Sequence, residues 1–349
     1  MLRKRRSPAR RITGENARPR PTRSARWQAF LGGWLLIVLL AACQGLIPRP
    51  TATPLPSATP SASPSPAPTF TASPSPSPSP SPTPTPAVLV GAGDIAICGQ
   101  EGDDQTAALL EQIPGEIFAA GDNSNEEGTL RQYQQCFDPS WGRFKERLHP
   151  VPGNHDYETA GALDYFTYFG AAAGEPGLGY YSYDLGAWHV IALNSNCPWI
   201  NGCGPDSPQA QWLLADLEAH PARCTLAYWH HARWSSGLAG SAFWLGDLWR
   251  ILYEHGAEVV ISGHDHDYER FARQNPEGEL DPNGMRQFVV GTGGAGYYPF
   301  GETILPASEV RHSGTFGVLK LTLYPDRYDW EFIPVAGETF TDSGSEACR

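Results

Sequence analysis

The amino-acid sequence predicts a mixed α/β fold, in which two β-sheets pack face to face and helices cover them from outside. Two patterns support this prediction. Between residues 87 and 266, short apolar runs that end in Gly-Asp or a similar pair alternate with segments of helical spacing, as expected for strands joined by helices. Beyond residue 285, paired apolar runs typical of β-hairpins replace the helical spacing. No internal repeat is visible, so we expect one domain over residues 88–349.

The individual elements follow from the same patterns. Eight segments have the apolar runs or the alternation of strands: 87–94, 116–122, 149–156, 179–196, 224–231, 258–266, 285–292 and 315–335. Two of these segments are predicted hairpins, which turn at Leu185-Gly186 and at Pro325-Asp326. Four segments have helical spacing: 106–113, 130–148, 207–217 and 243–255. Ser207 stands where an N-cap residue would begin the third of these helices.

The N-terminal segment has the features of a lipoprotein signal peptide. Residues 1–26 carry ten Lys or Arg and one acid, and an apolar run follows to residue 42. The run ends in Leu-Ala-Ala-Cys, which resembles the lipobox of bacterial lipoproteins. We therefore expect residues 1–43 to be a signal peptide and Cys43 to be lipidated. An uncleaved signal anchor with an incidental cysteine is the alternative.

Residues 44–87 consist mostly of Pro, Ser, Thr and Ala. Such a composition cannot bury a core and is typical of an extended, disordered stalk. A stalk between a lipid anchor and a folded domain implies work outside the cytoplasm. The sequence thus predicts an extracytoplasmic, membrane-anchored lipoprotein, on the cell surface or in the periplasm.

Charge divides the chain at the same place. The whole chain has 25 basic and 37 acidic residues, but only 14 of the basic ones lie beyond residue 87, with 36 of the acids. The folded part therefore has a net charge near −22. Such a domain has no basic surface that could displace the counterions of a nucleic-acid backbone. The composition argues against bulk nucleic-acid binding, but not against a short phosphoester bound through metal ions.

The cysteines agree with export. Once Cys43 is assigned to the lipobox, six cysteines remain, and an even number outside the cytoplasm predicts disulfides. Cys197 and Cys203 flank a five-residue loop that contains Pro, Asn and Gly, and they form the easiest pair. Elimination leaves two further pairs: Cys98 with Cys136, and Cys224 with Cys348. A zinc site is the alternative, which the lack of any Cys-x-x-Cys disfavours.

Metal-binding side chains recur where the predicted strands run into loops. They are Asp94, Asp122, Asn154, His230, His264 and His266. Carboxylate, amide and imidazole groups suit a hard or borderline metal, and two aspartates with three histidines are too many ligands for one ion. Loops at strand ends are also where layered α/β folds carry their chemistry. The sequence therefore predicts a hydrolase with two metal ions.

These motifs, GD, GDN, GNHD, a strand-end His and GHDHDYER, resemble those of the calcineurin-like metallophosphoesterase superfamily. The last motif, together with Ala96 in a position where other branches have histidine, is similar to the purple acid phosphatase branch. The resemblance covers about residues 88–335 and implies a four-layer αββα sandwich with a dinuclear metal centre. It also implies the ligand set. Asp94 and His266 would bind the first metal, Asp122 would bridge the two metals, and the second site would be completed by Asn154, His230 and His264.

One position departs from that branch. Purple acid phosphatases have a tyrosine three residues after the bridging aspartate, and its phenolate binds ferric iron and gives the colour. Here Asn125 stands in that position, and a neutral amide cannot hold Fe(III) in the same way. We therefore expect no purple colour. The metals remain open among Fe, Mn and Zn.

The resemblance implies in-line attack on phosphorus by a metal-bound hydroxide. His155 is the main candidate to hydrogen-bond the phosphate or to protonate the leaving alkoxide, and His231 is a second candidate. Since strand side chains alternate, His230 and His231 should not face the same metal. Asp156 is expected to orient His155 by accepting a hydrogen bond from its other ring nitrogen.

The expected function is hydrolysis of small phosphomonoesters, with the membrane reached through Cys43 and no protein partner implied. Two alternatives stay open. The same site could serve a phosphodiesterase or nucleotidase, a choice that depends on loops such as 157–180 and 232–245. The fold could also serve as a non-catalytic surface binding module, of which Asn125 would be an early sign.

Overall fold

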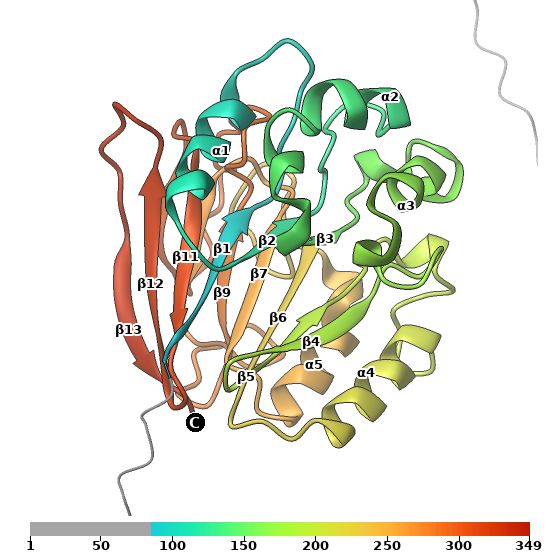
Figure 1. The fold of residues 1–349 in the computed structure, drawn as a ribbon. Coiled ribbons are helices and arrows are strands. Elements are labelled where there is room, and N and C mark those ends of the chain that lie inside the picture. Colours follow the sequence, from blue (N-terminus) through green and yellow to red (C-terminus); the bar gives the residue numbers. More distant parts are fainter. Residues whose placement is uncertain (1–84) are drawn as a thin grey trace, which may run out of the picture. The chain divides into compact units, whose positions relative to one another are not determined.

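The structure, a computed structural model, describes residues 85–349, which form two β-sheets packed face to face (Figure 1). The first sheet has the order β13-β12-β11-β1-β2-β3. Its strands are β1 (Ala87–Ala92), β2 (Glu116–Ala120), β3 (Leu148–Val151), β11 (Gly317–Leu323), β12 (Arg327–Pro334) and β13 (Ser343–Ala347). The second sheet has the order β10-β8-β9-β7-β6-β5-β4. Its strands are β4 (Tyr181–Leu185), β5 (Trp188–Ala192), β6 (Cys224–His231), β7 (Val259–Gly263), β8 (Tyr268–Phe271), β9 (Arg286–Val290) and β10 (Ser308–His312).

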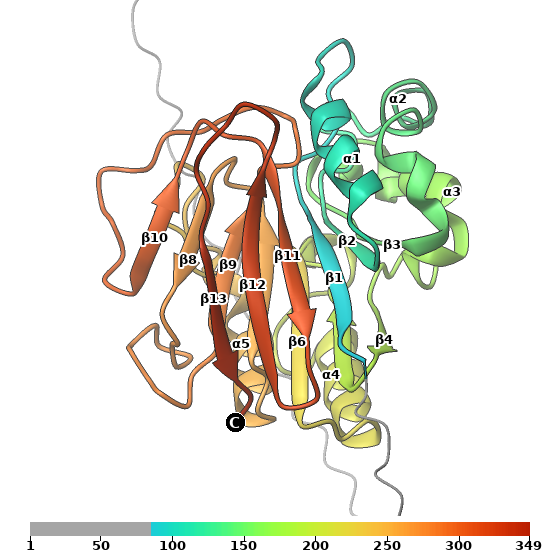
Figure 2. The same ribbon diagram turned by 60° about the vertical axis from the view of Figure 1, so that its left-hand side comes forward.

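Helices cover the outer faces of both sheets (Figures 1 and 2). They are α1 (Gly102–Gln112), α2 (Leu130–Gln132), α3 (Leu163–Phe169), α4 (Pro208–Ala219) and α5 (Gly246–Glu254), with short 3-10 turns between them. Leu213 of α4 and Leu248 of α5 belong to one apolar cluster with Ala227 of β6. Leu110 of α1 lies in the other cluster with Leu89 of β1. The predicted four-layer αββα sandwich is confirmed.

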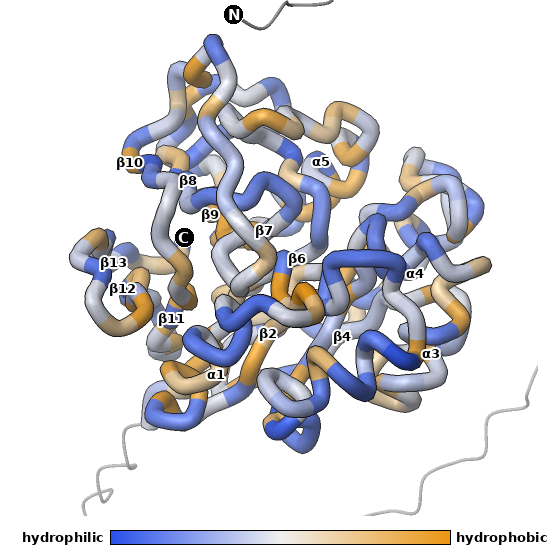
Figure 3. Tube along the Cα trace, turned by 90° about the horizontal axis from the view of Figure 1, so that it is seen from above, coloured by the Kyte–Doolittle hydropathy of each residue, from blue (hydrophilic) through white to orange (hydrophobic). Residues whose placement is uncertain are grey.

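Strand β6 shows how the layers are built. Its residues are all buried, and they alternate between the two apolar clusters. Leu226 and Tyr228 face the interior between the sheets, whereas Ala227 and Trp229 face α4 and α5. Apolar stretches of β2 and β6 lie in the middle of the molecule when it is seen from above (Figure 3). Because both faces of the strand are buried, its sequence is a continuous apolar run that ends in two histidines.

The parallel strands bring the predicted site together. Strands β1, β2 and β3 are parallel neighbours in the first sheet. Strands β5, β6, β7 and β9 are parallel neighbours in the second sheet. The carboxyl ends of parallel strands meet at one edge of a sheet, so the loops that follow them converge. The candidate functional residues lie in those loops.

Most predicted elements are confirmed, including both hairpins and the Ser207 cap, whose side chain accepts from the amide of Ala210. The continuous helix predicted over 130–148 is wrong. That segment consists of α2, a π-helical turn over Tyr133–Phe137, a 3-10 segment over Trp141–Arg147 and the beginning of β3. Pro139 lacks the N–H that a helix interior needs, which explains the break.

Three disulfides join the pairs that the sequence predicts: Cys98–Cys136, Cys197–Cys203 and Cys224–Cys348. The predicted signal peptide with Cys43, and the stalk as far as residue 84, lie outside the described residues. Within residues 85–349, no helix is both long enough and apolar enough to span a bilayer.

Candidate metal centre

The six candidate ligands lie at one end of the two parallel strand sets. Asp94 follows β1, Asp122 follows β2 and Asn154 follows β3. On the facing sheet, His230 is the penultimate residue of β6, and both His264 and His266 follow β7. Four of the six residues are buried; Asn154 and His264 are partly exposed. The structure thus brings together all six residues that the sequence singled out.

The backbone at three of these residues is strained. Asp94, Asp122 and His264 have φ values of 59°, 49° and 72°. Only two other non-glycine residues within 85–349 have a positive φ. This conformation costs free energy for residues that carry a Cβ, and it persists where the surrounding structure enforces it. Clustering of such strain at one place is typical of functional sites.

One part of the centre is formed by Asp94 and His266. Nε2 of His266 lies 3.3 Å from Oδ1 of Asp94. The second oxygen, Oδ2, accepts from the backbone N–H of His264 at 2.8 Å. The ring of His266 stacks on Tyr298, with the centroids 3.9 Å apart and the planes at 5°. These contacts fix the orientations of the carboxylate and the imidazole. Oδ1 of Asp94 and Nε2 of His266 are left facing each other.

The other part is formed around His230. Its Nδ1 lies 2.9 Å from the carbonyl oxygen of Ala120, so Nδ1 carries the proton and donates. In the neutral ring, which metal binding requires, Nε2 then presents a lone pair. It lies 3.1 Å from Oδ1 of Asn154, 3.1 Å from Nδ1 of His264 and 3.2 Å from Oδ2 of Asp122. Three buried or half-buried ligand atoms thus lie within 3.2 Å of Nε2 of His230.

Asp122 lies between the two parts. Ligand atoms of Asp94, Asp122 and His230 fall within 4.8 Å of one another. The side-chain amide of Asn125 lies 3.4 Å from Oδ1 of Asp94 and from Oδ2 of Asp122, so it sits against both carboxylates. Buried oxygen and nitrogen acceptors that face one another need a donor or a cation between them. Carboxylate, amide and imidazole groups are common ligands of metal cations. The donor set therefore fits metal ions.

Electrostatics in the centre follow the same grouping. Burial raises the pKa of Asp122, but the His230 ring beside it lowers that pKa well below its usual range on balance. Burial lowers the pKa of His230, and the Asp122 carboxylate raises it to about 9. Burial and the charge on His230 lower the pKa of His264 to about 4. Positive charge is thus favoured beside Asp122, while protonation of His264 is disfavoured and leaves its lone pair free.

His155 is oriented differently from the expectation. Its Nδ1 donates to the carbonyl oxygen of Glu126 at 2.6 Å, and its Nε2 lies 4.0 Å from Oδ2 of Asp122. The prediction that Asp156 accepts from His155 is wrong. Asp156 is fully buried on the other side of the loop, where it accepts from the backbone N–H of Gly153 at 2.8 Å.

Asp156 instead joins the loops that carry two candidate ligands. It accepts from the side chain of Asn123, which follows Asp122, and from the backbone N–H of Gly153, which precedes Asn154. The hydroxyl of Tyr133 also donates to it. Burial and the nearby Asp122 carboxylate raise the pKa of Asp156 to about 6. Its position makes it a residue that holds the centre together.

His231 only partly follows the alternation of the strand. The ring projects toward β5, where Nδ1 lies 2.8 Å from Oγ of Ser195. The pairing of β6 with β7 shifts register before His231, however, and its ring still lies 4.4 Å from that of His264 and 4.9 Å from that of His230. Ligand atoms of His230, His231 and His264 lie within 4.8 Å of one another, so the structure does not separate the two histidines in the way that the alternation predicts. Burial, followed by the charge on His230, holds the pKa of His231 well below its ordinary value, so this ring is neutral.

Comparison with known proteins agrees with this geometry. The family model of calcineurin-like phosphoesterases matches residues 88–268, more than half of the chain. The chain belongs to the calcineurin-like phosphoesterase family. All six candidate ligands, from Asp94 to His266, fall within the matched residues.

Within this family the chain is similar to purple acid phosphatases. Purple acid phosphatases 15 and 23 of Arabidopsis thaliana are 27% identical over 244 residues and 29% identical over 213 residues. The alignments cover 58% and 55% of this chain and 45% of each relative. The chain thus spans about half the length of the curated relatives it matches.

Solved structures show the same fold. Purple acid phosphatase PPD1 from yellow lupin seeds has a TM-score of 0.66 at 19% identity, over 75% of this chain and 54% of that chain. GAP50, the anchor in the inner membrane complex of Plasmodium, has a TM-score of 0.58 at 15% identity, over 76% of this chain and 90% of that chain. At identities below 20%, these similarities show that the fold is shared and nothing more.

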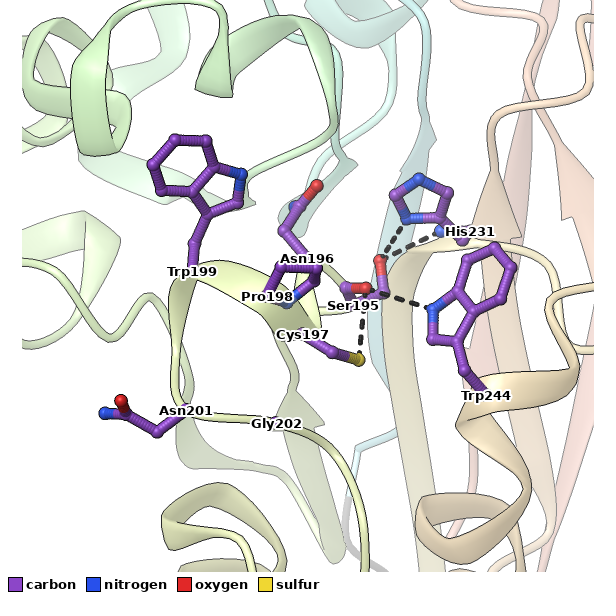
Figure 4. A pocket seen from close by; sticks show the side chains of 9 residues that line it. All are labelled: Ser195, Asn196, Cys197, Pro198, Trp199, Asn201, Gly202, His231 and Trp244. Atoms are coloured by element: carbon purple, nitrogen blue, oxygen red, sulfur yellow. Dashed lines mark hydrogen bonds between the residues drawn. The ribbon is translucent and has the colours of Figure 1, made fainter. Parts of the chain in front are cut away.

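Beside this calcineurin-like centre lies a pocket that the sequence did not predict (Figure 4). It has a volume of about 620 Å³ and is lined by Ser195, Asn196, Cys197, Pro198, Trp199, Asn201, Gly202, His231 and Trp244. Most of these residues belong to the loop after β5, and Trp244 lies just before α5. The available signal was the end of strand β5 itself, because its parallel pairing with β6 brings residues 193–196 to the edge where His231 lies.

Proposed function

We propose that this protein is a metal-dependent phosphoesterase with a dinuclear centre, which hydrolyses phosphomonoesters. The observation that carries the proposal is the convergence of Asp122, Asn154 and His264 on Nε2 of His230, with Asp94 and His266 beside them. Membership of the calcineurin-like phosphoesterase family supports the reaction class. The likeness to purple acid phosphatases supports monoesters as the substrates.

The two parts of the centre suggest which residues would hold each ion. Asp94 and His266 would bind the first cation, and Asn154, His230 and His264 the second. Asp122, which lies between the two parts, would bridge them. Iron, manganese and zinc suit this mixture of carboxylate, amide and imidazole groups. When bound, two such cations would acidify a water molecule and neutralise charge on the phosphoryl oxygens.

His155 is the proposed general acid. Because Nδ1 donates to the Glu126 carbonyl, Nε2 is the atom that gains and loses a proton, and it faces Asp122 from a partly exposed position. A protonated Nε2 there can deliver its proton to the departing alkoxide oxygen. His231 is kept neutral by burial, so it is suited to donate a hydrogen bond or to line the site. Asp156 acts as a positioning residue through Gly153 and Asn123.

We also propose that the protein works outside the cytoplasm, anchored to the membrane through a lipid on Cys43. The Leu-Ala-Ala-Cys motif and the Pro-rich segment after it support this location. The three disulfides support it independently, since disulfides persist in oxidising compartments. Replacing Cys43 with Ser and fractionating the cells tests the anchor. Equal membrane association of the variant and the native chain would refute it.

The activity is tested by hydrolysis of p-nitrophenyl phosphate and bis-p-nitrophenyl phosphate. The full chain is loaded separately with iron, manganese or zinc, and Asp122→Ala is the blank. Faster turnover of the monoester, lost in the blank, is the expected result. Preference for the diester would redirect the proposal to phosphodiesters. A folded, metal-loaded protein that turns over neither ester would overturn the enzymatic function and favour a binding module.

A further inference from the structure

We propose that the pocket between Trp199 and Trp244 binds an aromatic ring on the alcohol side of the substrate, so that the enzyme prefers monoesters of aromatic alcohols. This inference rests on the proposed phosphoesterase function. The pocket, of about 620 Å³, lies beside the metal centre, because His231 lines it and the ring of His231 lies 4.4 Å from that of His264. Its volume is in the range of small-molecule sites. An ester with its phosphoryl group at the centre would thus have its alcohol part in reach of the pocket.

Two tryptophans form the walls of this pocket (Figure 4). The residues Trp199 and Trp244 are 55% and 54% exposed, so both are in contact with solvent. Exposed large apolar side chains that gather at one place often mark a ligand-binding site. Planar aromatic faces bind other aromatic rings by stacking and edge contacts. The chemistry of the walls therefore matches a planar ring.

Both indoles are held in place before any ligand arrives. The ring of Trp199 stacks on Tyr157, with the centroids 5.4 Å apart and the planes at 18°. The indole N–H of Trp244 donates to the carbonyl oxygen of Ser195 at 3.4 Å. The Cys197–Cys203 disulfide closes the loop that carries Trp199. A ring that enters such a slot orders few side chains, which lowers the entropic cost of binding.

The floor of the pocket offers few polar groups to a ligand. Oγ of Ser195 is taken by the backbone N–H and by Nδ1 of His231. The side-chain amide of Asn196 donates to the carbonyl oxygen of Pro152 at 2.9 Å, which also ties the floor to the loop of Asn154. Among the described residues, the nine that line the pocket include no Asp, Glu, Lys or Arg. The pocket therefore suits an uncharged ring and gives no support to a second phosphate or an ammonium group.

The test compares two esters that both leave as primary alkoxides and differ in the ring: benzyl phosphate and ethyl phosphate. Trp199→Ala and Trp244→Ala should each raise KM for benzyl phosphate about tenfold, the size of one lost aromatic contact, and should leave ethyl phosphate nearly unchanged. Phe243→Ala is the matched control, because Phe243 is 69% exposed next to Trp244 but does not line the pocket. Equal KM values for the two esters, or equal effects of Phe243 and the tryptophans, would overturn the proposal.

A second arm separates this inference from the proposed function. Saturation-transfer NMR detects binding of benzyl alcohol and ethanol to the full chain after chelation, when no turnover is possible. Tryptophan-dependent binding of benzyl alcohol alone, in a protein that hydrolyses no ester, would leave the ring site standing and remove the phosphoesterase. Ester hydrolysis without any tryptophan-dependent binding of benzyl alcohol would support the phosphoesterase and overturn the ring site. Adenosine 5′-monophosphate, assayed beside benzyl phosphate, shows whether the ring that gains from the tryptophans is a nucleobase or a simpler aromatic group.

Discussion

The substitution Gly121→Ala tests whether the backbone before the bridging aspartate fixes the position of His230. Gly121 has φ of +86°, and a Cβ added there would lie 2.5 Å from Nδ1 of His230 and 2.6 Å from its Cβ and Cγ. Non-bonded carbon atoms prefer about 3.5–4.0 Å, so the ring would have to move by about 1 Å. His230 is fully buried, and its ring is hydrogen-bonded to the carbonyl oxygen of Ala120, the last residue of β2. The ring therefore has little room for that movement.

The expected loss of stability has two parts. A left-handed conformation costs a residue with a Cβ about 1–2 kcal/mol, and overpacking of a buried site costs about 1–3 kcal/mol. Gly121→Ala should therefore lower the free energy of unfolding by about 2–5 kcal/mol. Gly99→Ala is the matched control: Gly99 has φ of +83°, but an added Cβ meets no described atom within 4 Å. That variant should lose only the first part, about 1–2 kcal/mol.

Urea unfolding of both variants, in the presence of a chelator, measures the two losses without a contribution from metal binding. Metal affinity is then measured by competition with a chelator of known affinity. We expect Gly121→Ala to lose about 10- to 100-fold in affinity, as misplaced ligands do, and Gly99→Ala to lose none. If the two variants unfold with the same free energy and bind metal equally well, then the contact with Gly121 does not position His230 and the reasoning fails.

Three further outcomes are expected. Iron-loaded protein should lack the purple colour, and Asn125→Tyr should gain the visible absorption of an iron phenolate, because residue 125 contacts both carboxylates of the centre; a purple native protein would contradict this. His155→Ala should lower kcat about 100-fold while the bound metal, measured by elemental analysis, stays the same; an unchanged kcat would exclude His155 as the general acid. Burial lowers the pKa of His189, but Asp216 and Asp184 raise it above its ordinary value on balance. The stability that this ion pairing contributes should be complete below about pH 6.5 and lost as the pH rises through the raised pKa, and His189→Gln should remove this slope from unfolding measured between pH 5 and 9. A slope that survives in His189→Gln would assign it to other groups.

The centre could be predicted from sequence because its signals are local. Each candidate ligand stands at the end of an apolar run, and Asp94, Asp122 and His264 each follow a glycine. The structure gives the reason for two of these glycines: a Cβ at Gly121 would strike His230, and one at Gly263 would lie 2.5 Å from Oδ2 of Asp94. A glycine before a polar residue at a strand end therefore marks close approach of backbone to a neighbouring ligand.

Features that depend on distant contacts could not be predicted. Strands β8, β10 and β13 were missed as separate elements, and β10 and β13 form the edges of their sheets, where one neighbour alone defines them. The contact of His155 with Glu126 crosses from one strand-end loop to another, and no spacing in the sequence announces it. Trp199 and Trp244 stand 45 positions apart and line the same pocket because β5 and β6 pair in parallel.

The charge of the domain makes a final prediction about metal removal. Beyond residue 87 there are 36 acidic and 14 basic residues, so the protein as a whole repels a phosphate ester. Among the described residues, the ring of His230 is the positive group that most lowers the pKa of Asp122, and the pocket lining contains neither Lys nor Arg. Attraction for the phosphoryl group must therefore come from the bound cations. Chelation should abolish binding of inorganic phosphate itself, measured by calorimetry, and reloading should restore it. Phosphate binding that survives chelation would reveal an anion site built from the protein alone and would refute this assignment of charge.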